Sequence, residues 1–451
     1  MKLEIATLYD ASHKERCHAR GETFWFEYLQ EILCQLGISA RKITPEASGI
    51  EEKLRELKVL FMGTQHVHDY GTKGAARDIE DWVAEGGLLI GFRTEGLDHV
   101  FGNTHHSDVT QNVDDFTASG YFDFGEHRLT EGIHSVIAPD QKLLIFSDIR
   151  AVASDSSEQI AGLYLKETGR EEAAAITINQ VGKGLAVYFS FDVAKTFRVL
   201  HHGKPVYEGS EGTGGRWWIR APQKTVIENH SDKVGYADEL LFLLQNIIAL
   251  TKTPFIYQLP PKGDKIPAAL FHWAGDDEGD RTGIQLRASN WMKGKGLPYH
   301  INVMEVAGEK IPLTKEDAVA ILENGHELSC HYNFTLCDGK PKKSDKNNPL
   351  RATESETERQ AERFEDKFGL KPLAGATHCC IWYGGPEPAK WMKNVGGIAN
   401  NSNASPGHIF NGSNLGFAFG TAYPYYFYED AKNGNDRIGF MEIPITGYEL
   451  G

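Results

Sequence analysis

In the first 250 residues, short apolar runs alternate with stretches in which apolar residues recur at helical spacing. Apolar runs predict buried strands at 3–9, 58–63 and 88–92, and helical spacing predicts helices over 24–36, 75–84 and 239–250. Strands that alternate with helices in this way predict a parallel sheet covered by helices. Two further apolar runs, 173–179 and 185–191, flank Gly182-Lys183-Gly184 and predict a β-hairpin.

A change in composition marks the best candidate for a domain boundary. Residues 253–267 are rich in proline and polar side chains, as in Leu259-Pro260-Pro261-Lys262-Gly263. We therefore divide the chain into an α/β domain at 1–255, a linker at 256–267 and a second domain at 268–451.

The second half again follows a β/α pattern. Helices are predicted at 282–293, 314–324 and 353–368, and strands at 299–304, 326–331 and 374–382. Thr353 and Glu356 form a capping box at the start of the third helix, and Gly369 ends it. An apolar run at 268–271 is expected to form the strand that precedes two acidic residues, Asp276 and Asp277.

Composition narrows the classes of partner. The 451 residues are 41% hydrophobic and 24% charged, with a net charge of −15. This acidic balance argues against a nucleic acid or an anionic membrane as partner, and no apolar run is long enough to span a bilayer. The start of the chain reads as a strand instead of a signal peptide, so a cytoplasmic location is the default, and export stays open if a signal was removed. Six cysteines show no disulfide or zinc-finger spacing.

Two acidic residues and a histidine are the strongest candidates for chemistry. Asp276 and Asp277 fall at the carboxyl end of a predicted strand, where β/α barrels build their sites. In the strand at 326–331, alternation places His331 on one face and His326 on the other, with Leu328 and Cys330. One imidazole near a carboxylate is half of a hydrolytic metal site.

His378, near the end of the strand predicted at 374–382, is a third candidate and can equally be a hydrogen-bonded core histidine. Its neighbours Cys379 and Cys380 can be metal thiolates, but their apolar surroundings favour burial as small hydrophobic side chains.

Together these motifs carry a family resemblance. The segment Gly275-Asp276-Asp277-Glu278-Gly279, followed about 50 residues later by Gly325-His326-Glu327-Leu328 and His331, resembles the polysaccharide deacetylase family. The resemblance covers roughly 267–451. It implies an incomplete (β/α) barrel that uses a divalent metal, most consistent with Zn²⁺, to remove acetyl groups from N- or O-acetylated sugars.

The resemblance also implies residue roles. Asp276 would be the general base, and Asp277 and His331 would be metal ligands. The family's second histidine, four residues after the first, is replaced here by Thr335, so we expect His378 to supply the missing imidazole. Glu278 and His408 are the candidates for the general acid.

Aromatic residues are candidates for contact with a sugar. Trp273 and Trp382 flank the acidic and histidine motifs, and Tyr423 and Tyr425 belong to the aromatic run 422–428. The alternative for this run is an edge strand that packs its aromatic side chains against the barrel.

The first half resembles a class I glutamine-amidotransferase-like domain through 57–63 and 86–96, which implies a flavodoxin-like three-layer α/β fold. It lacks the cysteine on a Gly-x-Cys-x-Gly elbow that such an enzyme needs, so His66 and His68 are read as loop histidines. We expect a non-catalytic domain for packing, substrate framing or formation of a homo-oligomer.

The sequence thus predicts a metal-dependent carbohydrate deacetylase joined to a catalytically silent domain. The alternative is a glycan-binding protein on a degenerate deacetylase barrel, favoured by Thr335.

Overall fold

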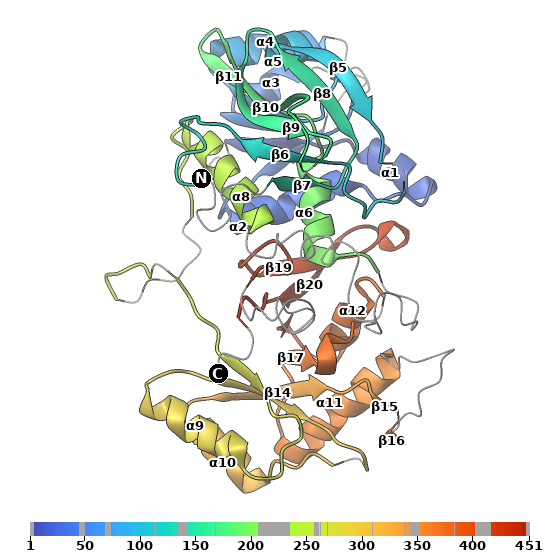
Figure 1. The fold of residues 1–451 in the computed structure, drawn as a ribbon, viewed down its shortest axis with the longest axis vertical. Coiled ribbons are helices and arrows are strands. Elements are labelled where there is room, and N and C mark those ends of the chain that lie inside the picture. The colour runs from blue at the N-terminus through green and yellow to red at the C-terminus, as the bar shows by residue number, and fades with distance from the viewer. Residues whose placement is uncertain are drawn as a thin grey trace. The chain divides into compact units, whose positions relative to one another are not determined.

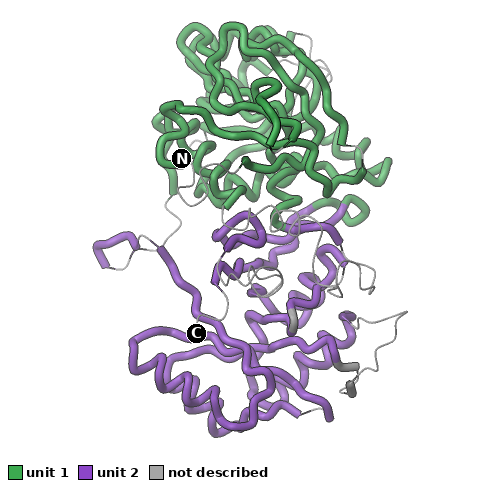
Figure 2. The backbone as a smooth tube through the Cα atoms, in the orientation of Figure 1, with its two compact units in different colours: residues 1–201, 228–258, 431–435 green, residues 202–227, 259–430, 436–451 purple. Residues whose placement is uncertain are grey.

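The computed structural model describes residues 4–44, 50–67, 74–111, 113–133, 142–166, 168–205, 235–256, 261, 263–267, 269–308, 310–337, 340–341, 352–382, 384–401 and 416–447. The chain divides into two compact units: 1–201, 228–258 and 431–435 form unit 1, and 202–227, 259–430 and 436–451 form unit 2 (Figure 2). One change of unit, between residues 258 and 259, falls inside the predicted linker at 256–267. No helix in the described part of the chain is long and apolar enough to cross a membrane.

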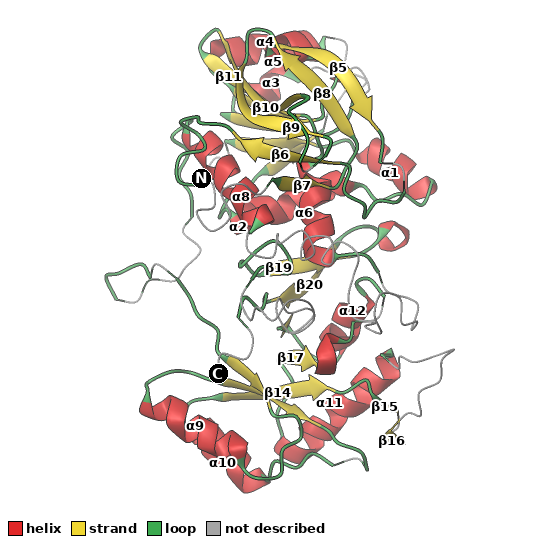
Figure 3. Cartoon of the chain, in the orientation of Figure 1, coloured by secondary structure: helices red, strands yellow, loops and turns green. Residues whose placement is uncertain are grey.

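Unit 1 is built on a parallel sheet that continues into antiparallel strands (Figures 1 and 3). Its parallel strands are, in sheet order, β2 (Arg41–Ile43), β1 (Ile5–Leu8), β3 (Val59–Met62), β4 (Leu88–Phe92) and β11 (Gly184–Phe189). The remaining strands are β10 (Ala173–Val181), β9 (Glu158–Tyr164), β8 (Ile149–Ser154), β7 (Leu143–Ile145), β6 (Gly120–Phe124) and β5 (Asn103–Val109).

The helices of unit 1 cover both faces of this sheet. Every residue of β1, β3 and β4 is buried, as expected for central parallel strands with helices on both sides. The described helices of unit 1 are α1 (Ala11–Ala19), η1 (Trp25–Tyr28), α2 (Leu29–Gln35), α3 (Glu51–Leu54), α4 (Ala75–Glu85), α5 (Asp98–Phe101), α6 (Val193–His202), α8 (Tyr236–Ala249) and η5 (Ala431–Asn433).

The hairpin of β10 and β11 forms as the sequence predicts. The two strands pair antiparallel from Val181 and Gly184 onward. A Cβ atom at Gly184 would lie 2.0 Å from the carbonyl oxygen of Val83, so only glycine lets the hairpin approach the end of α4.

Unit 2 contains a seven-stranded sheet that is parallel except at one edge. Its order is β12 (Ala274–Asp276), β13 (His300–Met304), β14 (Glu327–Tyr332), β17 (Ala374–Thr377), β18 (Ala399–Asn400), β20 (Arg437–Glu442) and β19 (Tyr425–Tyr428), and β19 runs antiparallel. A short pair, β15 (Leu336–Cys337) and β16 (Lys340–Pro341), stands apart. Because β12 and β19 do not pair in the described residues, this α/β sheet is open.

Helices connect these strands: α9 (Ile284–Gly294), α10 (Lys315–Glu323), α11 (Glu354–Phe368) and α12 (Glu387–Asn394). As predicted, the Thr353 side chain accepts a hydrogen bond from the Glu356 amide at the start of α11, and Gly369 ends that helix in the left-handed region.

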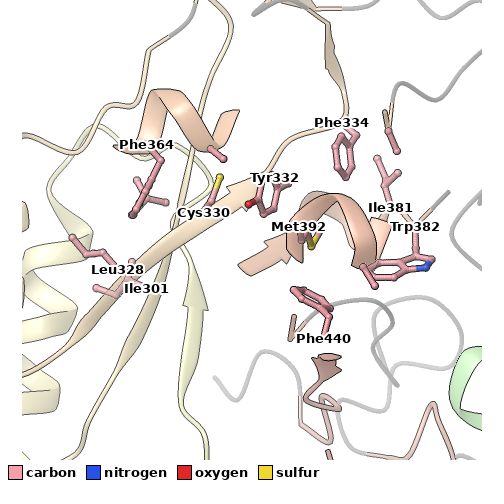
Figure 4. Close-up of a cluster of buried hydrophobic side chains, with 14 of the residues drawn as sticks. Ile301, Leu328, Cys330, Tyr332, Phe334, Phe364, Ile381, Trp382, Met392 and Phe440 are labelled. Atoms are coloured by element: carbon pink, nitrogen blue, oxygen red, sulfur yellow. The ribbon is translucent and has the colours of Figure 1, made fainter. Parts of the chain in front are cut away.

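The apolar core of unit 2 fixes which face of β14 is left for chemistry. Leu328, Cys330 and Tyr332 point from one face of β14 into a cluster that includes Phe364 of α11 and Phe440 of β20 (Figure 4). Successive strand residues point to opposite faces, so Ser329 and His331 lie on the other side of the sheet.

The expectation of a strand at 268–271 is wrong in the residues that the structure describes. Leu270 and Phe271 are 63% and 75% exposed, and the strand begins three residues after Phe271, at Ala274. Apolar residues in a row are buried only where a partner strand or helix covers them, and these two residues have no partner strand among the described residues.

Candidate active site

The first component of the candidate site is Asp276, the last residue of β12. It pairs in register with Asn302 of β13, and the Asn302 Nδ2 atom donates a hydrogen bond of 2.9 Å to Asp276 Oδ1. The second carboxylate oxygen, Oδ2, lies 3.7 Å from Nε2 of His331. Asp276 is therefore oriented by one neighbouring strand and faces a histidine on the next.

His331 on β14 is the second component of the candidate site. It is 1% exposed, and among the described residues neither of its ring nitrogens has a hydrogen-bond partner. A buried polar group normally forms a hydrogen bond, because leaving it unpaired costs about 1–3 kcal/mol. A cost of this size points to a group kept for binding something else.

His378 and Glu278 complete a three-residue cluster with His331. His378 is the first residue of the 3₁₀ turn η4 (His378–Cys380), which follows β17, and its Nδ1 atom lies 3.1 Å from Glu278 Oε2. The rings of His331 and His378 are 5.3 Å apart and meet edge to face. One candidate ligand atom from each of the three residues lies within 4.8 Å of the other two.

The backbone is strained on both sides of this cluster. Glu278 and Cys380 adopt φ angles of 49° and 52°, which residues other than glycine rarely do. Gly279 continues the turn with φ 65°, and a Cβ atom there would lie 2.2 Å from Val306. Backbone strain is retained where the surrounding structure enforces it, often at functional sites.

Asp277, which the family resemblance makes a metal ligand, has a different environment. Its Oδ1 atom accepts hydrogen bonds from the amides of Gly279 (2.9 Å) and Met304 (2.8 Å), and its Oδ2 accepts one of 3.1 Å from Gln285. Burial raises the pKa of this carboxyl group. Asp277 thus anchors the turn, and the geometry presents Glu278 to the histidines in its place.

The turn after β12 explains this exchange. Strand β12 ends at Asp276, and Glu278 adopts a positive φ angle, so strand alternation does not continue to Glu278. Asp276 and Glu278 contact His331 and His378, whereas Asp277 between them is buried in the protein.

Thr335, at the position of the missing family histidine, does not join the cluster. Its hydroxyl and its amide both donate to Asn333 Oδ1, at 2.5 and 3.1 Å. The expectation that His378 takes over from this position is compatible with the geometry. His408, the other candidate acid, lies outside the described residues, as does His68.

The candidate sugar-contacting aromatic residues separate into two groups. Trp382 and Tyr425 are buried in the core of unit 2, where Trp382 stacks on Phe427 with ring centroids 5.1 Å apart. Their assignment as sugar contacts is corrected, because their faces are already covered. Strand β19 is an edge strand that packs its aromatic residues inward, as the alternative held, whereas Trp273 and Tyr423 are half-buried and keep exposed surface.

Three polar residues beside the cluster were not predicted. Asn302, Ser329 and Asn401 are buried on β13, on β14 and directly after β18. The Ser329 hydroxyl and the Asn401 Nδ2 atom have no hydrogen-bond partner within the described ranges. The sequence did carry a signal for these residues, because polar residues occupy alternate positions in strands that are otherwise apolar.

The comparisons with known proteins add little. No family model matches the chain, and no curated protein matches it. Among solved structures, a β-galactosidase from Bacillus circulans sp. alkalophilus is 16% identical, with a TM-score of 0.32, and the match covers 43% of this chain and 29% of that one.

A β-galactosidase from Rahnella sp. R3 has a TM-score of 0.32 at 12% identity, over 42% of this chain and 29% of its own. A putative ThuA-like protein from Bacteroides uniformis is 12% identical, with a TM-score of 0.32. The match covers 55% of this chain and 89% of that one. The chain thus spans under a third of each galactosidase, and similarities this weak assign no function.

Proposed function

We propose that unit 2 is a metal-dependent hydrolase that removes acetyl groups from a carbohydrate. The observation that carries the proposal is the cluster of Glu278, His331 and His378 beside the carboxylate of Asp276. The cluster lies at the carboxyl ends of β12, β14 and β17, the edge where α/β sheets bind ligands.

The donor set fits a divalent metal, and Zn²⁺ in particular. Two imidazoles and one carboxylate are a frequent ligand set of catalytic zinc, which keeps a fourth position for water or substrate. The buried ring of His331 forms no hydrogen bond to any described residue, which supports this assignment, since a metal would satisfy one of its nitrogens. The ligand carboxylate in this proposal is Glu278, not Asp277.

The side chains of the site then have distinct tasks. A bound metal would polarise the acyl carbonyl group and lower the pKa of a bound water. Asp276, held by Asn302, accepts the proton of the attacking water and returns it to the leaving oxygen or nitrogen. The Glu278–His378 contact keeps both side chains turned toward His331.

The carbohydrate substrate rests on the resemblance of 267–451 to polysaccharide deacetylases. Trp273 and Tyr423 keep exposed surface for stacking on a sugar ring. The choice between N-acetyl and O-acetyl groups is left to assay.

Acetate release from N-acetylated and O-acetylated oligosaccharides tests the proposal. Protein loaded with Zn²⁺ should release acetate, chelator should abolish release, and Asp276→Asn should lower kcat by about 10²–10⁴-fold. Asp280→Asn is the matched control, because Asp280 is a turn-capping residue of the same loop.

An opposite result would favour the glycan-binding alternative. If the oligosaccharides bind equally well with chelator, and no acetate is released with any divalent metal, the hydrolase proposal is wrong.

A further inference from the structure

One cavity of unit 2, of about 740 Å³, is lined mainly by cationic side chains. The cations come from three places: Arg281 from the loop before α9, Lys310 and Lys315 from the segment that enters α10, and Arg363 and Lys367 from α11. Cationic side chains from segments far apart in the sequence thus line one cavity.

The charge of this cavity is opposite to that of the chain. Five cations and one carboxylate, Asp366, line the cavity, whereas the whole chain carries a net charge of −15. Ile311 and Pro312 complete the wall, so part of the lining is apolar. A concave surface with one sign of charge concentrates ions of the opposite sign.

Two of the cations repel one another in the absence of a counter-ion. Burial, together with the nearby Lys315 ammonium, lowers the pKa of Lys367, and Glu316 only partly opposes this effect. The Lys367 ammonium donates to the carbonyl oxygen of Ile311, which fixes its position at the wall. The arrangement has an electrostatic cost that a bound anion would relieve.

The cavity is distinct from the candidate active site. None of Glu278, His331 and His378 lines it. Arg281 is the nearest link in the sequence, three residues after Glu278 in the same loop.

We infer that this cavity is a binding site for a multiply charged oxyanion, a phosphate or sulfate ester group. Arginine presents a planar fork of donors that matches such oxygens, and lysine adds a compact charge. The inference is independent of the hydrolase proposal, because it uses none of the residues that would carry the reaction.

Calorimetric titration of the full chain tests the inference with three probes: inorganic pyrophosphate, a sulfated disaccharide and the same disaccharide without sulfate. We expect one charged ligand to bind per chain, with an affinity that falls as NaCl is raised. The double variant K315Q/K367Q should weaken binding by about tenfold or more, and K315Q alone by about threefold, because the first removes two cationic charges and the second removes one. Lys371→Gln is the control, since Lys371 is an exposed lysine outside the cavity lining.

The probes also separate the two sources of the anion. Tighter binding of pyrophosphate indicates a phosphate ligand, and tighter binding of the sulfated disaccharide indicates an anionic glycan; either result supports the site. Lys315 is exposed, so K315Q keeps the test valid if the double variant does not fold. Equal affinity of wild type and folded variants, or no difference between charged and neutral probes, would overturn the inference.

Discussion

Two buried polar side chains, Glu27 of unit 1 and His331 of unit 2, differ in whether they form hydrogen bonds within the described residues. In unit 1, Glu27 is buried and accepts hydrogen bonds from the Tyr9 hydroxyl (2.6 Å) and the Lys42 ammonium (2.5 Å). In unit 2, His331 is just as buried, yet neither ring nitrogen has a hydrogen-bond partner in the described structure. A polar group that is satisfied stabilises a fold, whereas one left unpaired costs stability and indicates a function.

Removal of the His331 imidazole is expected to have the largest effect. In His331→Leu, acetyl hydrolysis by the metal-loaded enzyme should fall by about 10³-fold or more, equivalent to roughly 4 kcal/mol of transition-state stabilisation. The free energy of unfolding without metal should not fall, because the substitution removes an unpaired buried group. Activity assays and denaturant unfolding measure the two effects, and His326→Gln, on the opposite face, should retain activity.

The reverse result is expected for the carboxylate of unit 1. Glu27→Gln removes the buried carboxylate that pairs with Lys42 and Lys14, so the free energy of unfolding should fall by about 3 kcal/mol. Acetate release should be unchanged at temperatures where the protein is folded. A variant as stable as wild type would show that the Glu27 ion pairs do not stabilise unit 1.

A steric prediction concerns the strand that carries Asp276. A Cβ atom at Gly275 would lie 1.9 Å from the Tyr299 hydroxyl oxygen, so Gly275→Ala should cost about 2 kcal/mol of stability. Tyr299→Phe removes that oxygen, and the double variant should recover part of the loss in thermal unfolding. If the double variant is no more stable than Gly275→Ala, the clash with Tyr299 is not the cause.

The smallest expected effect is a dependence of the free energy of unfolding on pH, caused by Glu239 of unit 1. Burial and the nearby Asp238 raise the pKa of Glu239 to about 7, above its value of roughly 4.3 in an unfolded chain. The folded state holds the Glu239 proton more tightly than the unfolded chain does. The protonated Glu239 therefore contributes fully to the free energy of unfolding below about pH 4, and this contribution is lost as the pH rises through 7.

Glu239→Gln should remove this loss. The variant should match wild type near pH 4 and exceed it by about 1–2 kcal/mol at pH 8 in denaturant unfolding. Exposed Glu52→Gln serves as the control. A constant difference between Glu239→Gln and wild type at both pH values would contradict the assignment.

Much of the fold could be predicted where burial imposes a clear pattern. Strand β4 has the predicted bounds, 88–92, because a central parallel strand is apolar throughout. Strand β5 was missed because five of its seven residues are exposed, which leaves no apolar periodicity to detect. The strands between 103 and 164 form pairs that depend on partners distant in the sequence.

The candidate site could be predicted in part. The sequence placed Asp276, His331 and His378 near strand ends, and the structure brings them together. It did not separate Asp277 from Glu278, because the choice depends on a turn in which Glu278 adopts a positive φ angle. Trp382 was misassigned because the sequence around it does not show whether its side chain points into the core or toward solvent.

In the proposed site, Glu278, and not Asp277, joins the two histidines in holding a metal. Equilibrium dialysis with Zn²⁺ on wild type, Glu278→Gln, His331→Gln, His378→Gln and Asp277→Asn, each shown to be folded, tests it directly. We predict one Zn²⁺ per wild-type chain, affinity at least about tenfold weaker in the first three variants, and near wild-type affinity in Asp277→Asn despite its lower stability. Loss of zinc in Asp277→Asn with retention in Glu278→Gln would contradict the account.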